Sequence, residues 1–153
     1  MSKKHIAFAC DDKDSFSGFY VKQLQNLDFR VTLCKSAQEV LQLFKAGERQ
    51  KPDMLMTDGM LPHGDEFSKE ETSGGFDTGV AIYRRLRKTG NHTLPIVIFT
   101  SELQTFDHLC VISDPHLTAI SLYEENFAKK ILDAARKLLL KAAPVPAQKR
   151  PNA

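Results

Sequence analysis

The sequence Met54-Leu-Met-Thr-Asp58-Gly-Met-Leu-Pro62 is a short apolar run that stops at an aspartate and meets a proline four residues later. Apolar runs of this length, followed by Gly and Pro, are typical of a buried strand that ends at a loop. In open α/β sheets, functional groups gather at the carboxyl ends of the strands. We therefore expect Asp58 at a partly shielded rim of a sheet. Taken alone, it would equally be a turn aspartate.

Strands and helices alternate on both sides of this run. Strand-like apolar segments are predicted at residues 5–10, 29–34, 53–57, 94–100 and 117–122. Helices are predicted at 15–27, from the capping box Ser36-Ala-Gln-Glu39 to Gly47, and at 78–88, 102–113 and 126–141. Five strand–helix repeats favour an α/β fold with a parallel sheet covered by helices on both faces.

Each predicted helix carries an apolar stripe that we expect to face the sheet. In order along the chain the stripes are Phe16, Phe19, Tyr20, Leu24 and Leu27, then Val40, Leu41 and Phe44, then Val80, Tyr83 and Leu86, then Phe127, Ile131, Ala135 and Leu138. Asp14 or Ser15 is the predicted N-cap of the first helix. The segment 94–100 is apolar at successive positions, which predicts a central strand that is buried on both faces.

Composition restricts the class of protein. A chain of 153 residues with an apolar fraction of 42% is long enough for one globular domain with a full core. The net charge is +2, and Lys149 and Arg150 near the end of the chain account for it. The sequence thus lacks the basic face expected of a nucleic-acid-binding domain.

Cysteine usage and the ends of the sequence indicate a cytoplasmic protein. Cys10, Cys34 and Cys110 are odd in number and far apart, so we expect a reducing compartment and no disulfides. The first five residues lead directly into a strand, which argues against a signal peptide. No apolar run approaches the length that crosses a membrane.

The segment 63–77 departs from the strand–helix pattern. It contains five acidic residues, one lysine and three glycines and has no apolar periodicity, so we predict a loop. Loops of this length inside a compact domain are usually functional or disordered. A solvated acidic excursion and a lid or partner surface both remain open interpretations.

Acidic and hydroxyl side chains follow three of the predicted strands. Asp11 and Asp12 end the first, Asp58 ends the third and Thr100 ends the fourth. These strand ends lie on the same edge of a parallel sheet, where three carboxylates would repel one another unless a cation joined them. Ligands that are all oxygens suit Mg²⁺. A carboxylate beside Mg²⁺ can attack phosphorus, and Thr100 can donate a hydrogen bond to a phosphoryl oxygen.

This set of residues resembles the receiver domain of two-component response regulators, the chemotaxis regulators among them. The matches are the acid pair Asp11-Asp12, Asp58 with Pro62 four residues on, and Thr100 at the end of Ile-Val-Ile-Phe-Thr. The resemblance covers residues 4–141 and leaves 142–153 as a Pro-rich tail or the start of a linker. It implies a doubly wound, flavodoxin-like sheet of five parallel strands in the order 2-1-3-4-5.

The resemblance also implies roles for these residues. Asp58 would be the phosphoacceptor and Thr100 the switch hydroxyl. Asp12, with help from Asp11, would hold Mg²⁺ together with Asp58 and the backbone carbonyl of Met60. The expected partners are a sensor histidine kinase or phosphotransfer protein and a downstream protein, and a homodimer is left open. No enzymatic activity is expected beyond self-phosphorylation from a phosphodonor and self-dephosphorylation.

Two features depart from the receiver pattern. The family usually has a lysine at the end of the fifth strand, whereas Tyr123 or Glu124 falls nearest to that position here. Lys13 is a candidate substitute, although a solvated surface lysine is the simpler interpretation. The interval from Asp58 to Thr100 is roughly a dozen residues longer than usual, so 63–77 has the character of an insertion.

Two alternatives to a phosphorylated receiver remain. The departures from the receiver pattern favour the first, and the second comes from other proteins that form an aspartyl phosphate. A pseudo-receiver would keep the fold and bind partners without being phosphorylated. A haloacid-dehalogenase-type phosphatase also forms an aspartyl phosphate, but it needs a second aspartate two residues after the first, where this chain has Met60. No Gly-Lys-Ser or Gly-Lys-Thr nucleotide motif is present.

Overall fold

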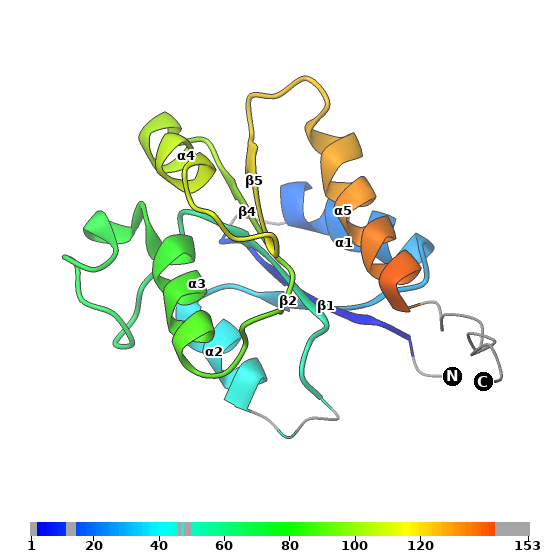
Figure 1. Ribbon diagram of the computed structural model, residues 1–153, viewed down its shortest axis with the longest axis horizontal. Helices are drawn as coiled ribbons and strands as arrows, with labels where there is room; N and C mark the ends of the chain where they lie inside the picture. The colour runs from blue at the N-terminus through cyan, green and yellow to red at the C-terminus, as the bar shows by residue number, and fades with distance from the viewer. Residues whose placement is uncertain (1–2, 12–14, 46, 48–49, 143–153) are drawn as a thin grey trace, which may run out of the picture.

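The computed structural model describes residues 3–11, 15–45, 47 and 50–142. Within them, five strands form one parallel sheet in the order β2-β1-β3-β4-β5 (Figure 1). The strands are β1 (His5–Ala9), β2 (Arg30–Cys34), β3 (Met54–Asp58), β4 (Ile96–Thr100) and β5 (Leu117–Ser121). This confirms the predicted fold class and strand order, and each strand starts and ends within two residues of its predicted bounds.

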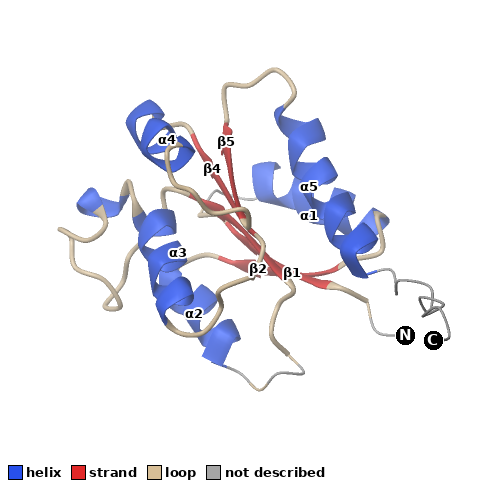
Figure 2. Ribbon diagram, viewed as in Figure 1, coloured by secondary structure: helices blue, strands red, loops and turns tan. Residues whose placement is uncertain are grey.

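Helices cover both faces of the sheet. Helices α1 (Ser15–Asn26) and α5 (Phe127–Ala142) lie on one face, and α2 (Ala37–Lys45), α3 (Thr78–Lys88) and α4 (Leu103–Cys110) lie on the other (Figure 2). Helix α4 is shorter than predicted, and α2 ends two residues before Gly47. The predicted N-cap Asp14 lies outside the described residues. In the described part of the chain, no helix has the length and apolar character needed to span a membrane.

The core is divided by the sheet into two clusters. Ile6 and Phe8 of β1 face α1 and α5, whereas Ala7 and Ala9 face α2 and α3, as the two-residue period of a strand requires. All five residues of β4 are buried, which confirms a central strand. The stripes predicted for α2, α3 and α5 are buried, as are Cys10 and Cys34. Neighbouring rings of Phe8, Phe16, Tyr20, Phe99 and Phe127 have centroids 4.8–6.2 Å apart.

The prediction that Phe19 belongs to the buried stripe of α1 is wrong. Its side chain is 50% exposed, whereas Tyr20 and Leu24 are buried. At 100° per residue, position 19 lies to the side of the line through positions 16, 20, 24 and 27. The Phe19 ring packs edge-on against Tyr20 from the outside, with centroids 5.0 Å apart.

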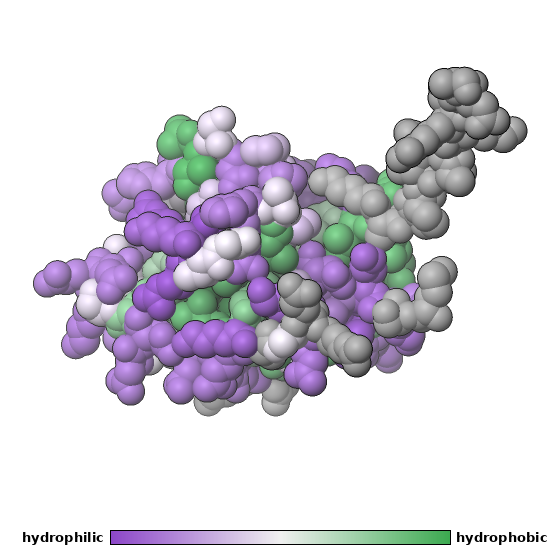
Figure 3. Space-filling view, turned by 60° about the horizontal axis from the view of Figure 1, so that its bottom comes forward, coloured by the Kyte–Doolittle hydropathy of each residue, from purple (hydrophilic) through white to green (hydrophobic). Residues whose placement is uncertain are grey.

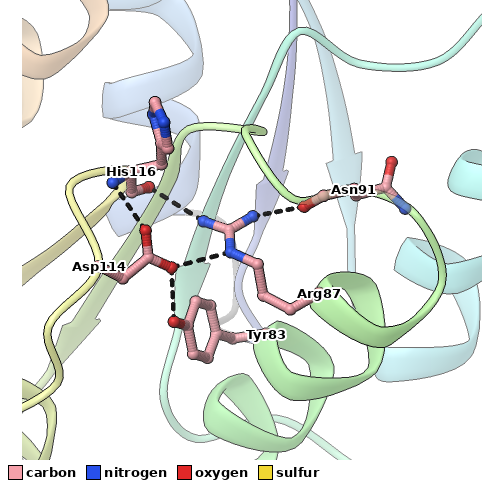
Figure 4. Close-up of polar contacts among 5 residues, drawn as sticks. All are labelled: Tyr83, Arg87, Asn91, Asp114 and His116. Carbon is pink, nitrogen blue, oxygen red and sulfur yellow. Dashed lines mark hydrogen bonds and ion pairs between the residues drawn. The ribbon is translucent and has the colours of Figure 1, made fainter.

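A cluster of polar side chains fastens α3 to the segment that leads into β5 (Figure 4). Asp114 accepts hydrogen bonds from the Tyr83 hydroxyl at 2.6 Å, Arg87 Nε at 2.9 Å and the His116 N–H at 2.8 Å. Arg87 also donates to the backbone oxygens of Asn91 and His116. Since β5 is an edge strand, this cluster fixes its start against the helix layer.

The cluster predicts a pH-dependent contribution to stability. Burial alone would raise the pKa of Asp114, but hydrogen bonds from Tyr83, Arg87 and the His116 N–H outweigh it and lower the pKa from 3.8 to about 2. Stability from a carboxyl with a lowered pKa is present above its unfolded-state pKa and is lost as the pH falls through the folded-state value. We expect Asp114→Asn to lower the free energy of unfolding by about 1–3 kcal/mol at neutral pH.

Urea denaturation between pH 7 and pH 2 checks this prediction. The difference between wild type and Asp114→Asn should narrow as the pH falls from about 4 towards 2. Asp107→Asn, at an exposed position on α4, is the matched control and should stay close to wild type. A difference that does not change with pH would show that the Asp114 charge is not what stabilises the cluster.

Candidate functional site

The carboxyl ends of β3 and β4 lie against each other at one edge of the sheet. Asp58 is the last residue of β3, and the next N–H, that of Gly59, donates to the Phe99 oxygen of β4 at 2.8 Å. Thr100 ends β4 and is fully buried. A Cβ built at Gly59 would lie 3.1 Å from Thr100 Oγ1, so the threonine hydroxyl packs directly beside the residue that follows Asp58. The structure therefore brings together the ends of the third and fourth strands, as predicted.

Asp11 and Asp58 open into one pocket of about 460 Å³. Asp11, just after β1, is exposed, whereas Asp58 is half-buried. The Met60 N–H donates to Asp58 Oδ1 at 3.0 Å, and Cys10 Sγ lies 4.0 Å from Oδ2. The backbone bond orients the Asp58 carboxylate at the mouth of the sheet.

The structure describes three of the four predicted metal ligands, namely Asp11, Asp58 and Met60. Asp12 lies outside the described residues. Among the residues that are described, no three His, Cys, Asp or Glu side chains lie close enough together to hold a metal ion. Asp11, Asp58 and Met60 do border the same pocket. Two carboxylates and a main-chain carbonyl would be a set of oxygen donors of the kind that suits Mg²⁺.

The first turn of α3 packs directly against the end of β3. The Gly79 N–H donates to the Gly59 oxygen at 3.0 Å, and Thr78 Oγ1 donates to the Leu61 oxygen at 2.6 Å. A Cβ at Gly79 would lie 2.6 Å from the Asp58 oxygen and 3.0 Å from Gly59 Cα. Our sequence interpretation missed this contact, although a glycine in the first turn of a predicted helix was a signal of close packing.

This contact predicts opposite effects for two glycine-to-alanine changes. Gly79→Ala should destabilise the protein by about 1–3 kcal/mol, because the new methyl group overlaps backbone atoms that cannot yield easily. Gly18→Ala is the matched control, since nothing lies within 4 Å of a Cβ at this position in α1. It should stabilise the protein by about 0.5–1 kcal/mol, because alanine favours the helix. Chemical denaturation of both variants measures the sign of each change in the free energy of unfolding. A Gly79→Ala variant that is more stable than wild type would contradict the close contact.

The acidic segment 63–77 folds onto the domain. Phe67 is buried in the core cluster beside α3, and Thr72 is fully buried. Arg85 of α3 lies 4.5 Å from the centre of the Phe67 ring and donates to the Glu66 oxygen at 3.2 Å. These contacts show that the segment is not a solvated excursion. An isolated phenylalanine among acidic residues was the signal available in the sequence.

Two turns give the segment its internal structure. Ser68 and Glu71 exchange hydrogen bonds between side chain and backbone N–H, at 3.0 and 3.2 Å, which is a capping box. The short 3₁₀ turn η1 (Ser73–Gly75) follows, and all three of its residues have positive φ. The segment leaves and rejoins the domain at neighbouring points, as an Ω-loop does.

The same segment walls the pocket and reaches α4. His63, Gly74, Gly75 and Phe76 line the pocket that contains Asp58. At the end of the segment, Asp77 Oδ1 accepts a hydrogen bond from Thr105 Oγ1 of α4 at 2.5 Å. The insertion thus connects the rim of the site to the helix that follows Thr100.

Neither residue nearest the expected lysine position lines this pocket. Tyr123 is 71% exposed. Glu124 pairs with Lys130 of α5 and accepts a hydrogen bond from the Ser121 N–H at 3.3 Å. The hydrogen bond from Lys130 is the main reason why the pKa of Glu124 is lowered. Of the described residues that line the pocket, none is a lysine or an arginine.

Comparison with solved structures identifies the fold. The receiver domain of a signal transduction histidine kinase from Syntrophus aciditrophicus is 14% identical with a TM-score of 0.67, covering 94% of this chain and 96% of that one. The chain has the fold of response regulator receiver domains. The beryllofluoride-activated N-terminal receiver domain of RstA from Klebsiella pneumoniae is 21% identical with a TM-score of 0.64. That match covers 89% of this chain and 98% of the RstA chain. No protein-family model matches the sequence, and no curated protein matches it either.

A third solved structure of this receiver fold contains a ligand. The response regulator protein TrrA from Thermotoga maritima, in complex with Mg²⁺ and BeF, is 15% identical with a TM-score of 0.58. The match covers 86% of this chain and 98% of that one. At these identities the comparisons show the fold alone, so the function of the site rests on its own residues.

Proposed function

We propose that this protein is a phosphoacceptor receiver that takes a phosphoryl group onto Asp58 and switches its contacts with other proteins. The observation that carries the proposal is the shared placement of Asp58, Asp11 and Thr100 at the carboxyl ends of three parallel strands. The donor would be a sensor histidine kinase or a phosphotransfer protein. We assign the receiver to residues 4–141 of a cytoplasmic protein and 142–153 to a tail or linker, of which 143–153 lie outside the described residues.

The residues of the chain have distinct parts in this reaction. An oxygen of the Asp58 carboxylate forms a bond to phosphorus while the bond from phosphorus to the donor breaks, and the donor leaves with that electron pair. The backbone bond from Met60 holds the carboxylate in place. Thr100 Oγ1 accepts the Glu102 N–H at 3.0 Å, so its own hydrogen can be donated to a phosphoryl oxygen.

The pocket suits Mg²⁺ as the resident cation. Asp11, Asp58 and the carbonyl of Met60 would bind it, together with Asp12, which lies outside the described residues. When bound, Mg²⁺ neutralises negative charge on the transferring phosphoryl group. The TrrA structure, which contains Mg²⁺ and BeF, supports this assignment by its fold.

Thr100 and the insertion provide a route from the site to a partner surface. If the Thr100 hydroxyl turns towards a phosphoryl group, it gives up its bond to the Glu102 N–H at the start of α4. The downstream protein, or a second copy of the chain, would then bind around α4, β5 and α5. The face shown in Figure 3 is mostly hydrophilic, with smaller hydrophobic areas between the polar side chains. Exposed apolar residues on or beside these three elements are Leu103 on α4, Val111 just after α4, and Tyr123 between β5 and α5.

A second candidate is a pseudo-receiver that binds partners without phosphorylation. It is favoured by one observation, the absence of lysine and arginine from the described lining of the pocket. An aspartyl-phosphate phosphatase is a weaker candidate, because Met60 occupies the position at which that class needs its second aspartate.

Phosphorylation of the purified protein by acetyl phosphate tests the proposal. Intact mass spectrometry should show one added phosphoryl group in wild type, dependent on Mg²⁺, and none in Asp58→Asn. An adduct that persists in Asp58→Asn would contradict the assignment of the phosphoacceptor. A wild type that forms no adduct with Mg²⁺ present would favour the pseudo-receiver.

A further inference from the structure

We propose that His63 is the phosphoryl-binding side chain that takes the place of the absent fifth-strand lysine. The inference rests on the proposed function and deepens it. It assigns to the insertion a role in binding the oxygens of the phosphoryl group on Asp58. Its imidazole would donate a hydrogen bond to one phosphoryl oxygen while the Thr100 hydroxyl donates to another.

The composition of the pocket is the first observation. Its described lining contains two acids, Asp11 and Asp58, and a single side chain that can carry positive charge, His63. Transfer of a phosphoryl group adds negative charge beside these two carboxylates. A donor on the pocket wall would offset that charge in a site that is partly shielded from water.

The hydrogen bonding of the His63 ring is the second observation. Its Nδ1 lies 2.7 Å from the backbone oxygen of Gly64. A carbonyl oxygen only accepts hydrogen bonds, so Nδ1 carries a proton. That leaves Nε2 as the ring nitrogen that can face a phosphoryl oxygen, to which the imidazolium form of the ring donates. Gly64 has a φ of +60°, a backbone conformation that glycine adopts without strain.

The backbone that leads into His63 is held by two hydrogen bonds. The Pro62 oxygen accepts the Ala37 N–H at 3.2 Å, which ties the preceding residue to the start of α2. The Leu61 oxygen accepts the Thr78 hydroxyl at 2.6 Å. His63 therefore extends from an anchored stem at the edge of the sheet, and a fixed backbone is what a binding residue needs.

The other candidate cations are less well placed. Arg85 is engaged by Glu66 and the Phe67 ring, away from the pocket lining. Lys130 pairs with Glu124 on the α5 side of the molecule. Lys13 lies outside the described residues, so it enters the experiment as a competing variant.

The test measures the rate of Asp58 phosphorylation by acetyl phosphate with Mg²⁺ in wild type, His63→Gln, His63→Lys and Lys13→Gln. His63→Gln replaces a donor that can be cationic by a neutral amide, and it should slow phosphorylation roughly tenfold or more. His63→Lys restores a cation and should stay within about threefold of wild type, because lysine also donates to phosphoryl oxygens. His92→Gln, at an exposed site between α3 and β4, is the matched control and should keep the wild-type rate.

The outcomes separate the two proposals. A wild-type rate in His63→Gln would overturn the role of His63 and leave the phosphoacceptor in place. Slow phosphorylation of His63→Lys, in a variant whose thermal unfolding midpoint equals that of wild type, would show that a cation at this position does not speed the reaction. That result would also overturn the role of His63. Slowing confined to Lys13→Gln would assign the role to Lys13. Absence of any adduct in wild type would remove the proposed function and this inference together.

Discussion

The arrangement of the site depends on a backbone contact between the end of β3 and the first turn of α3. Gly79 lies so close to the Asp58 carbonyl that no side chain fits between them, and its N–H bonds to the Gly59 oxygen. On the opposite side, the Gly59 N–H bonds to β4. Asp58 is thus held between a central strand and a helix. The insertion begins and ends outside this contact, so its length does not determine where the carboxylate lies.

The insertion has a structural role that its composition conceals. It is anchored through Phe67 and walls the pocket through Gly74, Gly75 and Phe76. It reaches α4 through the hydrogen bond between Asp77 and Thr105. Thr100 reaches the same helix through the Glu102 N–H. The wall of the pocket and the proposed switch hydroxyl therefore act on one element, so a change at the site can reach α4 by two routes.

Most of the fold could be predicted because local patterns and tertiary structure agree. The apolar run at the start of β4 predicted the central strand, which is buried throughout. The predicted capping box at Ser36 is seen in the hydrogen bond from the Glu39 N–H to Ser36 Oγ. The predicted ends of the strands were enough to place Asp58 and Thr100 on the same edge of the sheet, without knowledge of the packing. The contact at Gly79 and the burial of Phe67 could not be predicted, because both depend on which segments meet in space. The position of His63 in the pocket has the same origin, since the loop must fold back before His63 and Asp58 line the same pocket.

The most direct measurement of the central claim is a crystal structure of the protein with Mg²⁺ and beryllofluoride, a mimic of the phosphoryl group. We predict beryllium bound to an oxygen of Asp58, with fluorides in contact with Thr100 Oγ1 and His63 Nε2. The cation is predicted beside Asp11, Asp12 and the carbonyl of Met60. An Asp58 carboxylate that carries no beryllium, in crystals saturated with both components, would contradict the claim that this edge of the sheet is a phosphoacceptor site.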